Sequence, residues 1–180
     1  MGNLIRQHSN LSLTERLKLK KNQPALLLDI SGSMDIEVEP GLRRIDALRN
    51  VVNSLEGSFI CLAFNQTVQP CLKDSIPQPG GGTALSPALK EIKARNLRQA
   101  IIVTDGEVNE YDQEFTLKES EGLTLKIIYV GSSEKPKFLE KLAKQTGGFC
   151  DVEDLKQQKE LTTKIQGLLG PVETERKIEL

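Results

Sequence analysis

Five oxygen-bearing side chains stand in three short segments of the 180-residue chain, in a pattern that suits a hard metal cation. Asp29, Ser31 and Ser33 occupy alternate positions of the first segment, and alternate positions of an extended chain point to the same side. Thr83 follows a run of three glycines, and Asp105 follows an apolar run. Hydroxyl and carboxylate oxygens are the ligands that Mg²⁺ and Mn²⁺ prefer. We therefore expect one divalent-metal site if the fold brings these segments together.

Each of these segments borders a predicted strand or helix. Short apolar runs predict buried strands, and apolar residues three and four positions apart predict helices. The expected strands are 24–30, 58–64, 67–72, 99–104, 124–130 and 149–152. The expected helices are 45–55, one that begins at about residue 86, 113–120, 136–145 and 155–169.

This alternation predicts a doubly wound α/β fold, with a mainly parallel, Rossmann-like sheet and helices on both of its faces. Pro70 interrupts the strand 67–72, so we expect that strand at an edge, antiparallel to its neighbour after a turn at 65–66. Ligands of such sheets bind at the carboxyl ends of the strands. Asp29 and Asp105 follow two of those ends.

Composition and charge exclude several classes of function. Lys and Arg total 24 and Asp and Glu total 25, so a net charge of −1 argues against binding of nucleic acid by the whole domain. No apolar run approaches the roughly 18 residues of a membrane span, and we expect no membrane contact. The single histidine, His8, leaves no His-based metal site or catalytic triad.

The three cysteines, Cys61, Cys71 and Cys150, are odd in number and lack Cys-x-x-Cys spacing. They indicate a reducing, cytoplasmic compartment. If the segments 58–64 and 67–72 form a hairpin, Cys71 approaches Cys61, but we do not expect a disulfide there.

As a set, the Asp-x-Ser-x-Ser, Gly-Gly-Thr and Thr-Asp-Gly motifs resemble the metal-ion-dependent adhesion site of the von Willebrand factor A domain family. All five positions of that site are filled. The resemblance implies that Ser31, Ser33 and Thr83 bind Mg²⁺ or Mn²⁺ directly, and that Asp29 and Asp105 bind it mostly through water. It also implies one open coordination position, which an Asp or Glu of a partner protein completes.

The resemblance covers about residues 24–168 and is closest to intracellular, bacterial-type members, because we find no secretory signal and no flanking cysteine pair. Such members often act beside AAA+ ATPases or signalling enzymes, which is an analogy at the level of the family. The expectation is a binding module without catalysis.

Three alternatives are open at this point. One is an α/β scaffold or regulator whose metal site is vestigial. Another is a Mg²⁺-dependent phosphohydrolase of the haloacid dehalogenase type, but that chemistry needs a second Asp where Ser31 stands. The third is a nucleotide binder using Gly80–Thr83, but no Lys follows these glycines.

The predicted organisation is a basic leader (1–22), one domain (23–169) and a polar tail (170–180). Five basic residues against one acidic residue give the leader a net charge of +4. Asp35 and Glu107 flank the predicted site as solvated acidic residues, and Asp46 is expected to favour the start of its helix through the helix dipole.

Overall fold

The computed structural model describes residues 24–106, 108–131 and 134–170. The predicted leader (1–22), nearly all of the predicted tail (170–180) and Glu107 lie outside the described residues.

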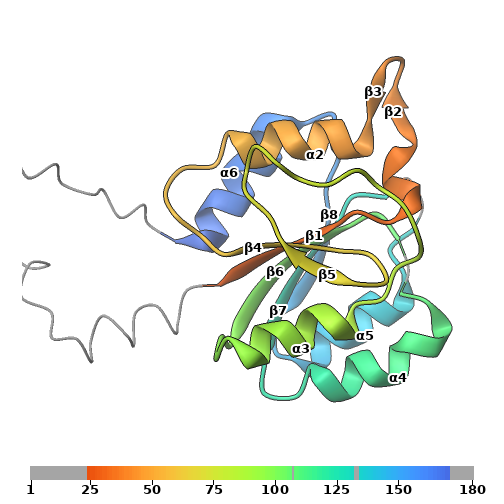
Figure 1. Cartoon of the computed structure of the whole chain (residues 1–180), viewed down its shortest axis with the longest axis vertical. Coiled ribbons are helices and arrows are strands. Elements are labelled where there is room, and N and C mark those ends of the chain that lie inside the picture. Colours follow the sequence, from red (N-terminus) through yellow and green to blue (C-terminus); the bar gives the residue numbers. More distant parts are fainter. Residues whose placement is uncertain (1–23, 107, 132–133, 171–180) are drawn as a thin grey trace, which may run out of the picture.

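A six-stranded mixed sheet in the order β5-β4-β1-β6-β7-β8 forms the centre of the molecule (Figure 1). All neighbouring strands are parallel except β5, which is antiparallel to β4, as Pro70 predicted. The strands are β1 (Ala25–Asp29), β4 (Cys61–Phe64), β5 (Val68–Pro70), β6 (Gln99–Thr104), β7 (Thr124–Tyr129) and β8 (Phe149–Val152). The predicted fold class is therefore confirmed.

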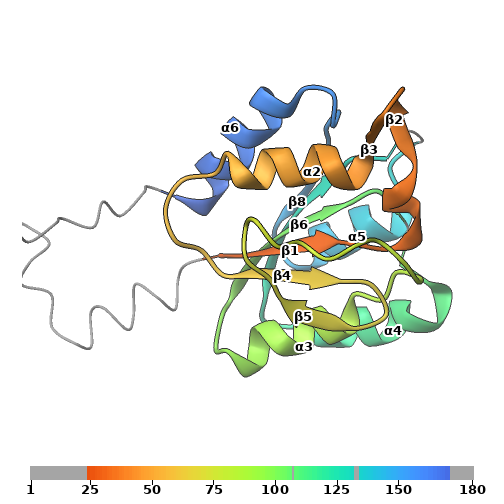
Figure 2. The same ribbon diagram turned by 45° about the horizontal axis from the view of Figure 1, so that its top comes forward.

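Five α-helices cover the two faces of this sheet. They are α2 (Arg44–Asn53), α3 (Ser86–Ala94), α4 (Glu110–Glu119), α5 (Lys137–Gln145) and α6 (Gln158–Leu169). Figures 1 and 2 show α2 and α6 on one face and α3, α4 and α5 on the other. Side chains of a strand alternate between faces, so Leu26 and Leu28 join the core under α2 and α6, while Ala25 and Leu27 join the opposite core. Burial on both faces explains why the strand sequences are almost wholly apolar.

The charged stretch between β1 and α2 contains elements that the sequence analysis did not predict. A 3₁₀ turn, η1 (Gly32–Asp35), is followed by a small hairpin of β2 (Glu37–Glu39) and β3 (Leu42–Arg43). Its turn contains Pro40 and Gly41, and Gly41 has φ +81°, which a residue with a side chain rarely adopts. These strands are too short for a periodic pattern, although Pro-Gly was a readable turn signal.

Two helices begin three residues away from the expected position. Helix α4 begins at Glu110 rather than at residue 113. Helix α6 begins at Gln158 rather than at residue 155, because Asp154 accepts a hydrogen bond from the Lys156 amide and thereby holds a turn there. Neither difference moves a residue of the predicted site.

The strand order reverses direction beside β1. Helix α2 connects β1 to β4 on one side, whereas α3 leads from the β4-β5 hairpin to β6 on the other side. Such a reversal separates the loops at the carboxyl ends of the two central strands and opens a crevice between them. Asp29 ends β1 and Asp105 follows β6, so both predicted carboxylates lie at this crevice.

A buried carboxylate on α4 holds the start of α3, the helix that follows Thr83. Asp112 is 3% exposed, and its Oδ2 accepts hydrogen bonds from the amides of Leu85 (2.7 Å) and Ser86 (2.9 Å) and from the Thr116 hydroxyl (2.8 Å). Its Oδ1 accepts the Ser86 hydroxyl. Helix α3 has no side-chain cap of its own, so Asp112 satisfies its first free N–H groups.

Replacing Asp112 by alanine should lower the free energy of unfolding by about 3 kcal/mol, because buried donors lose a charged acceptor. The midpoint of urea unfolding measures this. Glu114→Ala, at an exposed position of the same helix, is the control and should stay within about 0.5 kcal/mol of the wild type. Equal effects of the two substitutions would contradict this role of Asp112.

Candidate metal centre

Asp29 is the most deeply buried charged residue of the site, with no exposed surface. Its Oδ1 accepts a hydrogen bond from the Ser31 amide at 2.7 Å. Its Oδ2 accepts the hydroxyl of Thr104, which lies on the neighbouring strand because β1 and β6 pair with Leu28 beside Val103. The loop after β1 and the end of β6 therefore fix this carboxylate together.

Burial raises the pKa of Asp29 to about 6, because a carboxylate is poorly stabilised away from water. The hydrogen bonds from Thr104 and Ser31 lower the pKa but do not compensate for burial, and the nearby charge of Asp105 raises it further. A cation placed beside this group would favour its ionised form.

The two serine hydroxyls and Asp105 form a continuous row of oxygen atoms. Ser31 Oγ lies 3.1 Å from Ser33 Oγ, and Ser33 Oγ donates a hydrogen bond of 2.7 Å to Asp105 Oδ1. Oxygen ligands about 2.1 Å from an octahedral Mg²⁺ lie about 3.0 Å from their neighbours. The 3.1 Å between the two serine hydroxyls is close to that value, so these two oxygens fit neighbouring positions around a small divalent cation, with Asp105 hydrogen-bonded beside them.

Thr83 lies on the same side of the crevice. Gly106 follows Asp105, and a Cβ atom placed on it would lie 3.6 Å from Thr83 Oγ1 and 3.7 Å from Ser33 Oγ. Both hydroxyls thus face the backbone of Gly106. The Thr83 carbonyl accepts a hydrogen bond from the Asn109 amide at 2.9 Å. This bond joins the glycine-rich loop (residues 80–83) to the loop after β6.

Backbone hydrogen bonds join the glycine-rich loop to the loop that carries the serines. The Gly80 amide donates to the Ile30 carbonyl at 2.8 Å, and the Gly32 amide donates to the Gly81 carbonyl at 2.9 Å. Gly81 has φ +77°, and a Cβ atom on Gly32 would lie 3.3 Å from the Gly81 carbonyl oxygen. The close approach of the two loops therefore explains the glycines on both sides.

Arg44 is a residue of this site that the sequence analysis missed. Its Nη1 donates to Asp105 Oδ2 at 2.5 Å, and its side chain is 10% exposed while that of Asp105 is fully buried. A readable signal existed, because Arg44 lies on the same helical face as the apolar residues Leu48, Val51 and Leu55. A cation therefore already pairs with one of the two carboxylates.

The acidic residues around the site lie on its rim. Asp35, expected to be solvated, has an exposed side chain and accepts a hydrogen bond from Arg43 at 2.8 Å. Arg43 also binds Asp46, which lies in the first turn of α2 as expected and pairs further with Arg49. The ion-pair partners of both aspartates are Arg43 and Arg49 on the rim, so both aspartates stay outside the predicted ligand set.

Within the described ranges, no group of three His, Cys, Asp or Glu side chains could hold a metal ion by itself. The predicted ligand set is of a different type, because three of its five ligands are hydroxyl groups. The metal-binding role of Asp29, Ser31, Ser33, Thr83 and Asp105 stays a prediction, which their mutual geometry fits.

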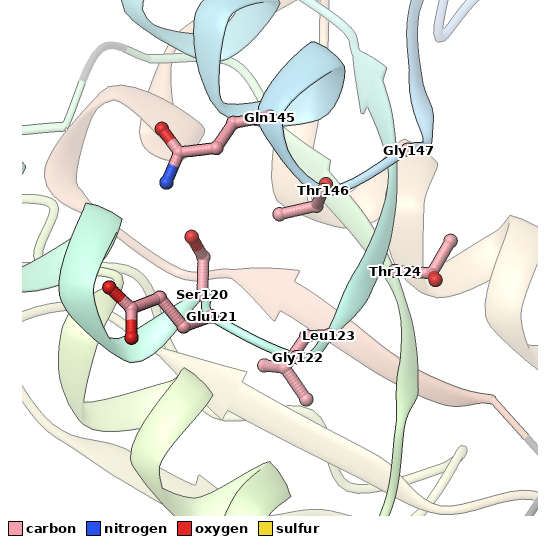
Figure 3. A pocket seen from close by; sticks show the side chains of 8 residues that line it. All are labelled: Ser120, Glu121, Gly122, Leu123, Thr124, Gln145, Thr146 and Gly147. Atoms are coloured by element: carbon pink, nitrogen blue, oxygen red, sulfur yellow. The ribbon is translucent and has the colours of Figure 1, made fainter.

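A separate pocket lies away from these residues. It has a volume of about 580 Å³ and opens where α4 and α5 end and β7 begins, at the opposite end of the sheet (Figure 3). It is lined by Ser120, Glu121, Gly122, Leu123, Thr124, Gln145, Thr146 and Gly147. Glu121 is the only ionisable residue among these eight, so the lining offers no pair of groups for acid–base chemistry.

Comparison with known proteins identifies the fold. Neither a family model nor a curated protein matches the chain. Among solved structures, a von Willebrand factor type A protein from Catenulispora acidiphila aligns with a TM-score of 0.62 at 19% identity, over 83% of this chain and 42% of its own length. This chain therefore spans less than half of that protein.

Two further structures are similar. An aerotolerance-related membrane protein from Bacteroides fragilis gives a TM-score of 0.56 at 15% identity, over 82% of this chain and 98% of its own length. Proximal thread matrix protein 1 from the mussel byssus gives 0.58 at 17% identity, over 80% of this chain and 44% of its own length. The chain has a von Willebrand factor A-like α/β fold, which supports the family resemblance at the level of the fold.

Among the described residues, no helix combines the length and the apolar character that crossing a membrane requires.

Replacing Asp29 by asparagine should stabilise the folded, metal-free protein, relative to the wild type, more at pH 7.5 than at pH 5. The folded-state pKa of about 6 lies above the ordinary value of 3.8, so the wild type loses stability as pH rises between these values. Asparagine has no such dependence. We expect the free energy of unfolding of the variant, relative to that of the wild type, to increase by roughly 1 kcal/mol between the two pH values.

Urea unfolding of chelator-stripped protein at both pH values measures this difference. Asp35→Asn, at an exposed carboxylate, is the matched control and should show no comparable increase. The stability of Asp29→Asn relative to the wild type could instead be independent of pH or fall as pH rises. Either result would show that burial does not raise the pKa of Asp29.

Proposed function

We propose that this chain is a divalent-metal-dependent protein-binding module that uses Mg²⁺ or Mn²⁺ to capture an Asp or Glu side chain of a partner protein. The observation that carries the proposal is the row of oxygens from Ser31, Ser33 and Asp105 beside the buried carboxylate of Asp29. These atoms come from loops that follow two different strands. Ser31 and Asp105 are 74 positions apart in the sequence, yet one hydroxyl, that of Ser33, links them.

In this proposal Ser31, Ser33 and Thr83 bind the ion through their hydroxyls, and Asp29 and Asp105 bind it mainly through water. Asp29 is already held by Ser31 and Thr104, so it can supply negative charge without moving. When bound, the ion supplies a Lewis-acidic position that a carboxylate can occupy.

The charges of the site favour an incoming carboxylate. Two carboxylates and the guanidinium of Arg44 give the site a net charge of −1. A divalent cation reverses this to a net positive charge, because the hydroxyl ligands are neutral. A partner's carboxylate then brings the site to neutrality. The rim is accessible, since Gly32 and Gly81 are exposed.

The class of partner that we propose is an AAA+ ATPase or a signalling enzyme, by analogy with similar domains. We propose a cytoplasmic location, because the cysteines are few, odd in number and without Cys-x-x-Cys spacing. We also propose that the chain is not an enzyme. The second acidic residue that a phosphohydrolase of the haloacid dehalogenase type needs is replaced by Ser31.

One observation favours a second candidate, an α/β scaffold or regulator with a vestigial metal site. Arg44 pairs with Asp105 at 2.5 Å and so neutralises one carboxylate without a metal. In this alternative, Arg44 replaces the ion permanently and partners bind elsewhere. The two candidates differ in one measurable property, which is the affinity of the chain for a divalent cation.

A Mn²⁺ titration of the chelator-stripped chain should reveal one site, with free Mn²⁺ measured by electron paramagnetic resonance. Mg²⁺ should displace the Mn²⁺. Asp29→Ala should weaken binding at least tenfold, because it removes one of two carboxylate charges. Water-proton relaxation, measured on the same samples, should be enhanced by bound Mn²⁺ and should fall when acetate displaces a bound water.

Asp35→Ala is the matched control, since it removes a carboxylate from the rim and should leave the affinity unchanged. Circular dichroism verifies that each variant is folded. Absence of Mn²⁺ binding in the wild type would favour the vestigial alternative. Unchanged binding in folded Asp29→Ala would show that the ligands lie elsewhere.

A further inference from the structure

Two cysteines face each other across the hairpin at the edge of the sheet. Strands β4 and β5 pair with Leu62 beside Pro70, so the next pair in the register is Cys61 with Cys71. The Cys71 amide donates to the Cys61 carbonyl at 3.1 Å, and the two sulfur atoms lie 3.2 Å apart. Both thiols are free.

The backbone separation expected for this pair lies in the range in which disulfides form. Directly opposite residues that are hydrogen-bonded in an antiparallel pair have Cα atoms about 5.5 Å apart. Disulfides form at Cα separations of about 4.4–6.8 Å. The side chains already point toward each other, with 3.2 Å between the two sulfur atoms, so the bond needs a further approach of these two atoms by about 1 Å.

The two thiols differ in access and acidity, which gives them different roles. Cys61 is 6% exposed, whereas Cys71 is only partly buried. The hydrogen bond with the Cys61 thiol lowers the pKa of Cys71, while that contact and burial raise the pKa of Cys61. Cys71 is therefore the thiol that a small oxidant reaches first, and Cys61 is the thiol that resolves the product.

We propose that Cys61 and Cys71 form a reversible dithiol–disulfide pair that responds to low-molecular-weight disulfides such as oxidised glutathione. The Cys71 thiolate attacks one sulfur of the oxidant, forms a mixed disulfide and releases one small thiol. Cys61 then gives up its proton and attacks Cys71 Sγ, which releases the second small thiol. Two protein thiols are oxidised, one small disulfide is reduced, and the two protons end on the released thiols.

The disulfide would cross-link the two sides of the β4-β5 hairpin covalently. Strand β5 lies at the edge of the described sheet, beside β4 (Figure 2). The turn of this hairpin also supports the glycine-rich loop, because Asn65 Nδ2 donates to the Gly80 carbonyl and the Asn65 carbonyl accepts the Ala84 amide, both at 2.8 Å. Oxidation would thus stiffen an element that positions this loop.

The third cysteine is an internal control. Cys150 lies on β8, at the opposite edge of the sheet from β5. Burial raises its pKa to about 11, so it is a poor nucleophile at neutral pH. Its tryptic peptide is also distinct, since Cys61 and Cys71 share the peptide 50–73 and Cys150 lies in 145–156.

The full chain is equilibrated in buffers of increasing ratio of oxidised to reduced glutathione, blocked with N-ethylmaleimide, digested with trypsin and analysed by mass spectrometry. The peptide 50–73 should convert from two blocked thiols to an internal disulfide in one two-electron transition, while Cys150 stays blocked. The oxidised chain should melt roughly 5–10 °C higher, because a short loop is closed.

Three variants test the assigned roles. Cys150→Ala should behave as the wild type. Cys61→Ala should accumulate glutathione on Cys71, and Cys71→Ala should accumulate little on the buried Cys61. Two blocked thiols in peptide 50–73 at every ratio, a glutathione adduct as the end product of the wild type, or a bond to Cys150 would each overturn the proposal.

Discussion

The burial of one carboxylate is the constraint on which the architecture of the site depends. Asp29 ends the central strand β1 with no exposed surface, so hydrogen-bond donors must come to it. The Ser31 amide and the Thr104 hydroxyl meet this need. The Thr104 contact requires the parallel register of β1 and β6, because a shift of one residue would turn Thr104 to the other face of the sheet.

The second carboxylate of the site, Asp105, also needs hydrogen-bond donors, but different groups supply them. Asp105 is also buried, but the guanidinium of Arg44 and the hydroxyl of Ser33 occupy its two oxygens. Among the described residues, Asp29 thus has no cationic partner, whereas Asp105 has one. This asymmetry leaves the site with a net negative charge in the absence of a metal, and it identifies Asp29 as the group that gains most from a nearby cation.

Sequence patterns predicted what depends on neighbouring residues in the chain. The strands β6 and β8 were predicted with their observed ends, and Pro70 predicted the antiparallel edge strand. Contacts between distant residues were not predictable in this way. Arg44 and Asp105 are 61 positions apart, and the sequence gives no sign of their pairing without a model of the crevice. The same holds for the Thr104 hydroxyl, 75 positions from Asp29.

We propose that the loops after β1 and β6 and the glycine-rich segment build one cation site. A crystal soaked in Mn²⁺ and measured near the manganese absorption edge tests this most directly. We expect one anomalous peak in contact with the hydroxyls of Ser31 and Ser33, on the side of Asp105 that faces them. A strong peak at another group of residues, or none at this crevice at millimolar Mn²⁺, would contradict it.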